Sequence, residues 1–410
     1  MKTRLLLPAL FIFAAAIGFA AEPDPGFTVH EWGTFTSVQG SDGVQMEWNP
    51  LVAPELPRFV YNNNRAPGST FKTGLVTRQR METPVIYFYS DQARTADVAV
   101  RFPQGTVTEW YPTQSAANAS LRAAPNPAVK EPALHWKQVE ILPASAPALP
   151  LPLEKSGSHY YAARATDASL LRVTADRKTE VEKFLFYRGV GYFTTPLTVT
   201  VDSMEPVRVL VNNSGAEELA SLFVYEVGAN GLLTWTPLEK LAPGESRSVI
   251  IAQPSGSGAD SLAAALRAAL VRQGLYEKEA AAMVQTWESS WFQERVLRVL
   301  YTLPRAWTDR TLPLTITPAP KTTERVMVAR AEIITPAMEN ALLSKVVHYI
   351  ATKPDQRWKI VAETRALGMG RFTSVAMSRV MTGAKRTPEF NTLAWELANV
   401  AAAPPKLDVR

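Results

Sequence analysis

The segment richest in side chains able to do chemistry is residues 29–36, which reads V-H-E-W-G-T-F-T. In an extended strand, successive side chains point to opposite faces. His30 and Trp32 would then share one face, and Glu31 would lie on the other beside apolar side chains such as Phe35. If that apolar face packs into the core, the carboxylate needs a cation or several hydrogen-bond donors, because an unpaired buried charge is very costly.

Arg188 poses the same problem with the opposite charge. It lies near the end of K-F-L-F-Y-R-G at 183–189, a run that is apolar on both faces. We therefore predict a buried, bidentate ion pair between Glu31 and Arg188. A structural role for this pair, as a rigid polar joint, is favoured over a catalytic one.

His30 next to Glu31 suggests metal binding or acid–base chemistry, but neighbouring strand residues diverge and cannot readily serve one metal ion. The histidines show none of the spacings typical of zinc sites, and the chain has no cysteine. A centre that gathers His30, His135, His159 and a carboxylate is the alternative left open. We predict no metal and no cofactor, and His348 is expected on a solvated helix side.

The motifs of covalent catalysis and nucleotide binding are missing. G-x-S-x-G does not occur, and G-M-G at 368–370 is too short for a nucleotide fingerprint. Trp32 and other aromatic residues on predicted strands could stack on sugars or enter a protein interface, although core packing is their commoner fate. The candidate binding or functional cluster is His30, Glu31, Trp32, Arg188 and His159.

Short runs rich in β-branched and aromatic residues, separated by Gly, Pro, Asn and Asp, must position this cluster. They fill residues 27–253 and favour antiparallel sandwiches. We predict a β-rich domain at 21–195, followed at 196–254 by strands of an immunoglobulin-like sandwich that pack against it.

The hydrophobic period changes after S-G-S-G at 255–258. Apolar residues then recur at helical spacing, with helices expected from Asp260, from about Glu277 and from Thr335-Pro336. Strands return between them, so 259–403 is predicted to be an α+β domain with a loose tail at 404–410. The expected fold class is mixed: an antiparallel, β-sandwich-rich N-terminal region followed by an α+β C-terminal region.

Residues 1–20 have a short basic start, an apolar run and small residues before Ala21, which is typical of a cleaved secretory signal peptide. The expected location is therefore the periplasm or the extracellular space, with no transmembrane segment after cleavage. Losing Lys2 and Arg4 lowers the formal charge from +5 to +3, so no nucleic-acid partner is expected. Basic stretches such as 353–386 are more often solvated faces, and this interpretation is favoured here. Contact with an anionic surface is the alternative.

Four runs together resemble an uncharacterised family of exported bacterial proteins. They are V-H-E-W-G-T-F-T at 29–36, M-E-T-P-V-I-Y-F-Y at 81–89, F-L-F-Y-R-G-V-G at 184–191 and W-E-S-S-W-F at 287–292. The resemblance spans most of the chain and implies one exported unit. It implies no activity, substrate or cofactor.

The paucity of catalytic motifs favours an exported binding or scaffold protein with an unknown ligand or protein partner. Its ligand surface is expected near residues 30–48 and the strand end at Arg188. The alternative is an extracytoplasmic hydrolase acting on carbohydrate or peptide through His30 and Glu31, with His159 as a further candidate.

Overall fold

The computed structural model describes residues 24–50, 56–62, 76–114, 133–154, 157–228, 230–251, 258–382 and 387–402. The predicted signal peptide and the predicted tail lie outside these ranges. A nine-stranded sheet forms the centre of the molecule, in the order β13-β12-β15-β17-β1-β3-β9-β5-β2. Its strands are β1 (Asp24–Gly40), β2 (Tyr61–Asn62), β3 (Gln79–Ser90), β5 (Gly105–Tyr111), β9 (Leu185–Gly191), β12 (Leu219–Val227), β13 (Leu233–Leu241), β15 (Leu297–Leu303) and β17 (Pro320–Ile334).

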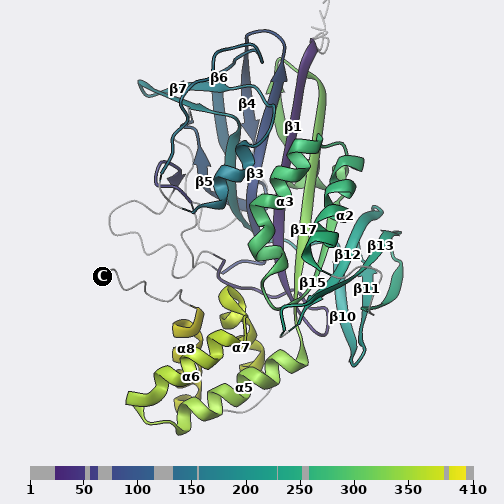
Figure 1. Ribbon diagram of the computed structural model, residues 1–410, viewed down its shortest axis with the longest axis vertical. Coiled ribbons are helices and arrows are strands. Elements are labelled where there is room, and N and C mark those ends of the chain that lie inside the picture. The colour runs from purple at the N-terminus through teal and green to yellow at the C-terminus, as the bar shows by residue number, and fades with distance from the viewer. Residues whose placement is uncertain are drawn as a thin grey trace, which may run out of the picture.

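The long strand β1 lies near the middle of this sheet (Figure 1). It pairs in parallel with β17, with Glu31 opposite Arg325, and antiparallel with β3, with Thr36 opposite Arg80. The two neighbours are therefore strands from distant parts of the chain. Strands of the predicted α+β region and of the predicted β-rich domain thus share one sheet.

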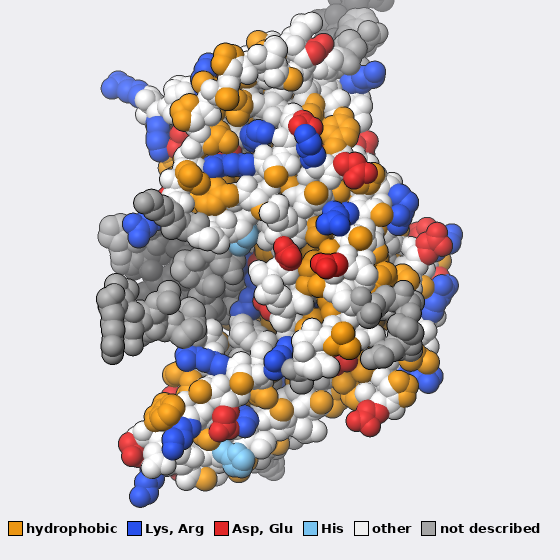
Figure 2. All heavy atoms as spheres, in the orientation of Figure 1, with side chains coloured by type: hydrophobic (Ala, Val, Ile, Leu, Met, Phe, Trp, Pro, Cys, Tyr) orange, Lys and Arg blue, Asp and Glu red, His pale blue; other side chains and the backbone are white. Residues whose placement is uncertain are grey.

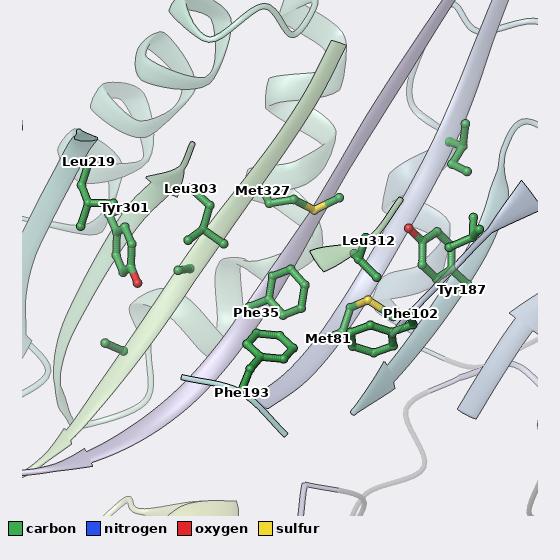
Figure 3. Close-up of a cluster of buried hydrophobic side chains, with 14 of the residues drawn as sticks. Phe35, Met81, Phe102, Tyr187, Phe193, Leu219, Tyr301, Leu303, Leu312 and Met327 are labelled. Carbon is green, nitrogen blue, oxygen red and sulfur yellow. The ribbon is translucent and has the colours of Figure 1, made fainter. Parts of the chain in front are cut away.

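Two smaller sheets cover one side of the large sheet, which we call the sheet face. One has the order β16-β4-β6-β7-β8 and the other β10-β11-β14, so the segment 196–254 divides between the latter sheet and the large one. Their apolar residues form one core with Phe35, Met81 and Met327 of the large sheet (Figure 3). Their strands are β4 (Arg94–Val100), β6 (Leu134–Ile141), β7 (Leu171–Ala175), β8 (Lys178–Glu182), β10 (Leu197–Met204), β11 (Val207–Asn213), β14 (Ser246–Ile250) and β16 (Leu314–Thr317).

The opposite side, which we call the helix face, is covered by α2 (Ala259–Arg272), α3 (Glu277–Phe292) and the short helix η1 (His159–Arg164) (Figure 1). Apolar residues at helical spacing bury one stripe of α2 and α3 against strand residues such as Trp32 and Val85. The two predicted helices are confirmed, and α3 starts at Glu277 as expected; α2 is preceded by Gly258, however, and Asp260 lies in its first turn and does not cap it.

The helices that follow β17 form a cluster at the end of the large sheet (Figure 1). The first begins as predicted, because the Thr335 hydroxyl accepts a hydrogen bond from the backbone nitrogen of Met338 and Pro336 occupies the first helical position. This cluster comprises α5 (Pro336–Ala351), η2 (Pro354–Gln356), α6 (Arg357–Ala366), η3 (Gly370–Phe372), α7 (Thr373–Thr382) and α8 (Pro388–Ala402), while α4 (Arg305–Thr311) lies between β15 and β16.

The predicted fold class is confirmed: the N-terminal region is rich in antiparallel sheets, and the C-terminal region combines helices with strands. In the part of the chain that the structure describes, no helix has both the length and the apolar character to cross a membrane.

Candidate functional site

Glu31 lies on the sheet face, is fully buried and has a cationic partner. Its Oε2 accepts a hydrogen bond from Nε of Arg325 at 2.5 Å, and its Oε1 accepts one from the hydroxyl of Tyr187 at 2.5 Å. Arg325 also donates to Asp309 at 2.7 Å. Burial and the Glu31 carboxylate raise the pKa of Tyr187 well above its usual value, which keeps the hydroxyl a donor.

The predicted pair of Glu31 with Arg188 is wrong. Tyr187 reaches Glu31 on the sheet face, and the next residue in a strand points the other way. Arg188 therefore lies on the helix face, where its Nε is 3.9 Å from Oε2 of Glu109 on β5. The buried acid has the kind of partner that the sequence demands, but from a different strand.

His30 lies on the helix face, 2% exposed, with Nδ1 2.7 Å from Oε2 of Glu279. Glu279 belongs to the first turn of α3 and is fully buried. It also accepts hydrogen bonds from the Tyr89 hydroxyl at 2.7 Å and from the backbone nitrogen of Tyr276 at 2.8 Å. The carboxylate thus fixes the start of α3 on β1 and β3.

A histidine held by a carboxylate has the elements of a general base. His30 is nevertheless enclosed, with the rings of Tyr276 and Tyr89 centred 4.4 and 5.4 Å from its own. Tyr89 lines a surface hollow of about 440 Å³ together with Thr28 and other polar residues, and His30 does not line it. Burial and Glu279 raise the pKa of Tyr89. This arrangement suits a joint between helix and sheet better than a catalytic centre.

Trp32 belongs to the core under the helices, His159 packs on Trp287 of that core, and neither joins His30 in one site. Trp32 is fully buried under the helices. The ring of His159 lies 5.1 Å from that of Trp287, whereas His30 contacts Glu279. These two α3 residues are eight apart, or roughly 12 Å along the helix. Glu31 and His30 each have one buried charged partner, whereas Arg188 lies on the helix face with a larger set of buried charges.

Those charges form what we call the charged belt, which crosses the helix face near the C-terminal helices. Its residues come from strands β15, β17, β3, β9 and β5, from the segment just after α3 and from η3. Thr34 and Thr36 of β1 lie within it and donate to Glu82. Its members are Arg80, Glu82, Glu109, Arg188, Glu294, Arg298, Arg330, Glu332 and Arg371.

One end of the belt centres on Glu332, which is fully buried. Arg298 and Arg330 both donate to its carboxylate, with Nη2 of Arg298 at 3.1 Å. Both also donate to Glu294 beyond the end of α3. Burial alone would raise the pKa of Glu294, but the arginines outweigh it and hold the pKa below its usual value. The two arginines and two glutamates at this end thus provide one another with hydrogen-bond donors and acceptors.

The other end centres on Glu82, which is 1% exposed. Its carboxylate accepts hydrogen bonds from Thr36 at 2.7 Å and from Arg371 of η3 at 2.7 Å, and Nε of Arg80 lies 3.0 Å away. Burial would raise the pKa of Glu82, yet Arg371, Arg80 and Arg330 hold it well below its usual value. This end of the belt therefore stays ionised and ties a C-terminal helix turn to the sheet.

Two guanidinium nitrogens at this end lack a well-formed hydrogen bond, although Nε of Arg80 lies 3.0 Å from Oε1 of Glu82. Within the described residues, the buried Nε atoms of Arg80 and Arg371 make no hydrogen bond. A buried donor without a partner costs about 1–3 kcal/mol. The belt also holds five arginines against four glutamates, so it carries an excess positive charge next to these donors.

The belt was missed at the sequence level, although a signal for it exists. Arg80-Met81-Glu82 and Arg330-Ala331-Glu332 each place opposite charges two residues apart in a strand, and such residues share a face. Their neighbours in the sheet come from strands distant in sequence. The belt as a whole is therefore set by the strand order.

The basic stretch 353–386 is only partly a surface feature. Arg371 is bound to Glu82, and Arg379 donates to Glu339 and to Asp42. Lysine and arginine side chains remain visible over the C-terminal helices (Figure 2). Those classed as exposed in the described part of the stretch are Lys353, Lys359 and Arg365.

In the described ranges, no three His, Asp or Glu side chains lie together as a metal site. No protein-family model and no curated protein matches the chain. Among solved structures, the yeast delta-COP-I mu-homology domain complexed with a Dsl1 WxWxV peptide matches at 9% identity and a TM-score of 0.30, and a second structure of that yeast domain at 7% and 0.30. Each match covers 76% of this chain and 98% of the other. A TM-score this low carries no argument about fold or ligand.

Proposed function

We propose that this chain is an exported binding protein that holds an anionic group at the Arg80–Arg371 end of the charged belt. The observation that carries the proposal is the pair of buried Nε donors, on two arginines that flank one carboxylate. Carboxylate, phosphate and sulfate groups accept hydrogen bonds from arginine in a planar, often bidentate geometry. An anion there would use both donors and offset the excess positive charge.

The surroundings suit a small anionic group. The Arg371 guanidinium lies over the rings of Trp48 and Phe372, at 5.6 and 5.1 Å from their centres. Its side chain is 13% exposed, whereas that of Arg80 is 3% exposed. Solvent thus meets this end of the belt at Arg371. Aromatic rings beside a guanidinium also fix its orientation.

The hydrolase alternative would need His30 and Glu31 to act on one substrate. They lie on opposite faces of the sheet, and each is bound to a different partner. The hypothesis of a binding protein is therefore better supported than that of a hydrolase.

The test is calorimetric titration of the mature protein with phosphate, sulfate, acetate and citrate. At least one anion should bind, and Arg80→Met or Arg371→Met should weaken it at least tenfold. The Arg80→Lys variant keeps the positive charge but loses the forked donors of the guanidinium group, so it should bind the anion with intermediate affinity. Arg172→Met is the matched control, because Arg172 pairs with Glu140 on an exposed surface and should leave binding unchanged.

Thermal unfolding of each variant checks that it is folded before titration. The absence of any anion binding by the wild-type protein would refute the proposal. Equal affinities for wild type, Arg80→Met and Arg371→Met would refute it as well.

A further inference from the structure

A second cavity lies where the large sheet, the three-stranded sheet and the C-terminal helices meet. Its volume is about 220 Å³. Cavities at the junction of structural units are common ligand sites, and this one is smaller than the 300–1,000 Å³ usual for drug-sized ligands. It would therefore hold a molecule of fragment size.

Its walls are mostly apolar. Three methionines contribute, one from the end of β10, one from α5 and one from the turn before η3: Met204, Met338 and Met369. Methionine side chains are flexible and polarisable, so they adapt to ligands of different shape. Val227 and Leu297 close the side formed by the large sheet.

Glu226 is the acid in this wall. Burial raises the pKa of its carboxyl, and no cation among the described residues acts on it. In the described part of the chain it forms neither a hydrogen bond nor an ion pair. The other charged lining residue, Arg295, donates instead to the carbonyl of Ala366 at 3.3 Å. The cavity thus combines an apolar body with one carboxyl that has no cation.

We propose that this cavity binds small primary amines with an unbranched or aryl apolar body, the ammonium group meeting Glu226 and the body lying among the methionines. An ammonium group donates three hydrogen bonds and would supply the cationic partner that Glu226 lacks among the described residues. The apolar body replaces water against the methionine walls.

The experiment titrates the mature protein with hexylamine, butylamine, 1-hexanol and hexanoate. Hexylamine should bind more tightly than butylamine by about fourfold per added methylene. The alcohol should bind at least tenfold more weakly than the amine of equal length, and hexanoate should not bind measurably. Glu226→Gln should abolish most of the difference between amine and alcohol.

Two further variants separate this cavity from general effects on the surface or on folding. Glu218→Gln removes an acid that pairs with Lys240 on an exposed surface, and it should leave amine binding unchanged. Ala341→Leu fills part of the cavity, because Ala341 lines it, and should weaken amine and alcohol alike. Equal binding of hexylamine and 1-hexanol, or amine affinity unaltered by Glu226→Gln, would overturn the proposal, as would no binding of hexylamine at all. The result is independent of anion binding at the belt.

Discussion

Glu31 and Arg325 lie side by side at the same level of two parallel strands, with Oε2 and Nε 2.5 Å apart in the core. The two strands are separated by most of the chain, so this ion pair joins the predicted β-rich domain to the predicted α+β domain. Tyr187 also donates to Glu31 and Arg325 also donates to Asp309, while within the described residues the buried Nη2 of Arg325 makes no hydrogen bond.

Removing either member of this pair should strongly destabilise the protein. Glu31→Ala leaves a buried guanidinium, and Arg325→Ala leaves a buried carboxylate, so each should lower the free energy of unfolding by about 3–5 kcal/mol. The double variant Glu31→Ala with Arg325→Ala should lose less than the two single losses combined, because neither charge is left alone. Urea unfolding measures all three. Strictly additive losses would show that the two side chains do not depend on each other.

The charged belt predicts a loss of stability in acid. The pKa values of Glu82 and Glu294 are lowered in the folded protein, whereas both would titrate near about 4.3 when unfolded. Their contribution is therefore fully present above about pH 4.3 and is lost as the pH falls through the lower folded values. The thermal unfolding temperature should change little between pH 7 and pH 5 and should fall steeply as the pH is lowered further.

Glu82→Gln supplies the control for that experiment. This variant should be less stable than the wild type at pH 7. Its unfolding temperature should decline less steeply below pH 4, because it lacks one of the two carboxyl groups that have a lowered pKa. A decline as steep as that of the wild type would mean that Glu82 does not contribute to the acid sensitivity.

His30→Ala should loosen the start of α3. The change leaves Glu279 with two of its three partners and removes a ring that packs on Tyr89 and Tyr276. A cost of about 1–3 kcal/mol is expected, together with faster hydrogen exchange in the first turn of α3. His348→Ala is the control, because that side chain is exposed. Unchanged exchange in α3 would argue against this role of His30.

Gly189 should not tolerate a side chain. A Cβ at this position would lie 2.3 Å from the carbonyl oxygen of Thr106 on the neighbouring strand, which is backbone and cannot rotate away. Gly189→Ala should lower the free energy of unfolding by about 1–3 kcal/mol, because the added methyl group overpacks this position. Gly157→Ala meets no atom within 4 Å and should be nearly neutral. Chemical denaturation of the two variants decides the point, and equal stabilities would contradict it.

Export is tested by the mature N-terminus. Expression of the full chain in a bacterium should yield extracytoplasmic protein that begins at Ala21, as read by mass spectrometry, because residues 1–20 have the features of a cleaved signal peptide. Replacing apolar residues of this segment with arginines should keep the protein in the cytoplasm. Intact Met1 on exported protein would contradict the expectation.

The sequence allowed the helices to be predicted because their signals are local. The apolar stripe before Gly274 and the Thr335-Pro336 start each depend on residues within a few turns of one another. The same holds for the need of Glu31 for a cation, which follows from its apolar neighbours within one strand.

The partners of the buried charges could not be predicted, because they depend on strand order. Arg325 reaches Glu31 only through a parallel pairing of strands nearly 300 residues apart, and Arg188 was excluded by the side of the strand on which it falls. Likewise, Glu82 meets Arg371 across 289 residues. No local pattern specifies such neighbours.

The central claim is that Arg80 and Arg371 hold an anion, and a crystal soaked in selenate tests it most directly. The anomalous difference map should show a selenium peak with oxygens in hydrogen-bonding range of both Nε atoms, and Arg80→Met crystals should lack it. A wild-type map with selenate only at exposed surface arginines, and none beside Arg80, would contradict the account.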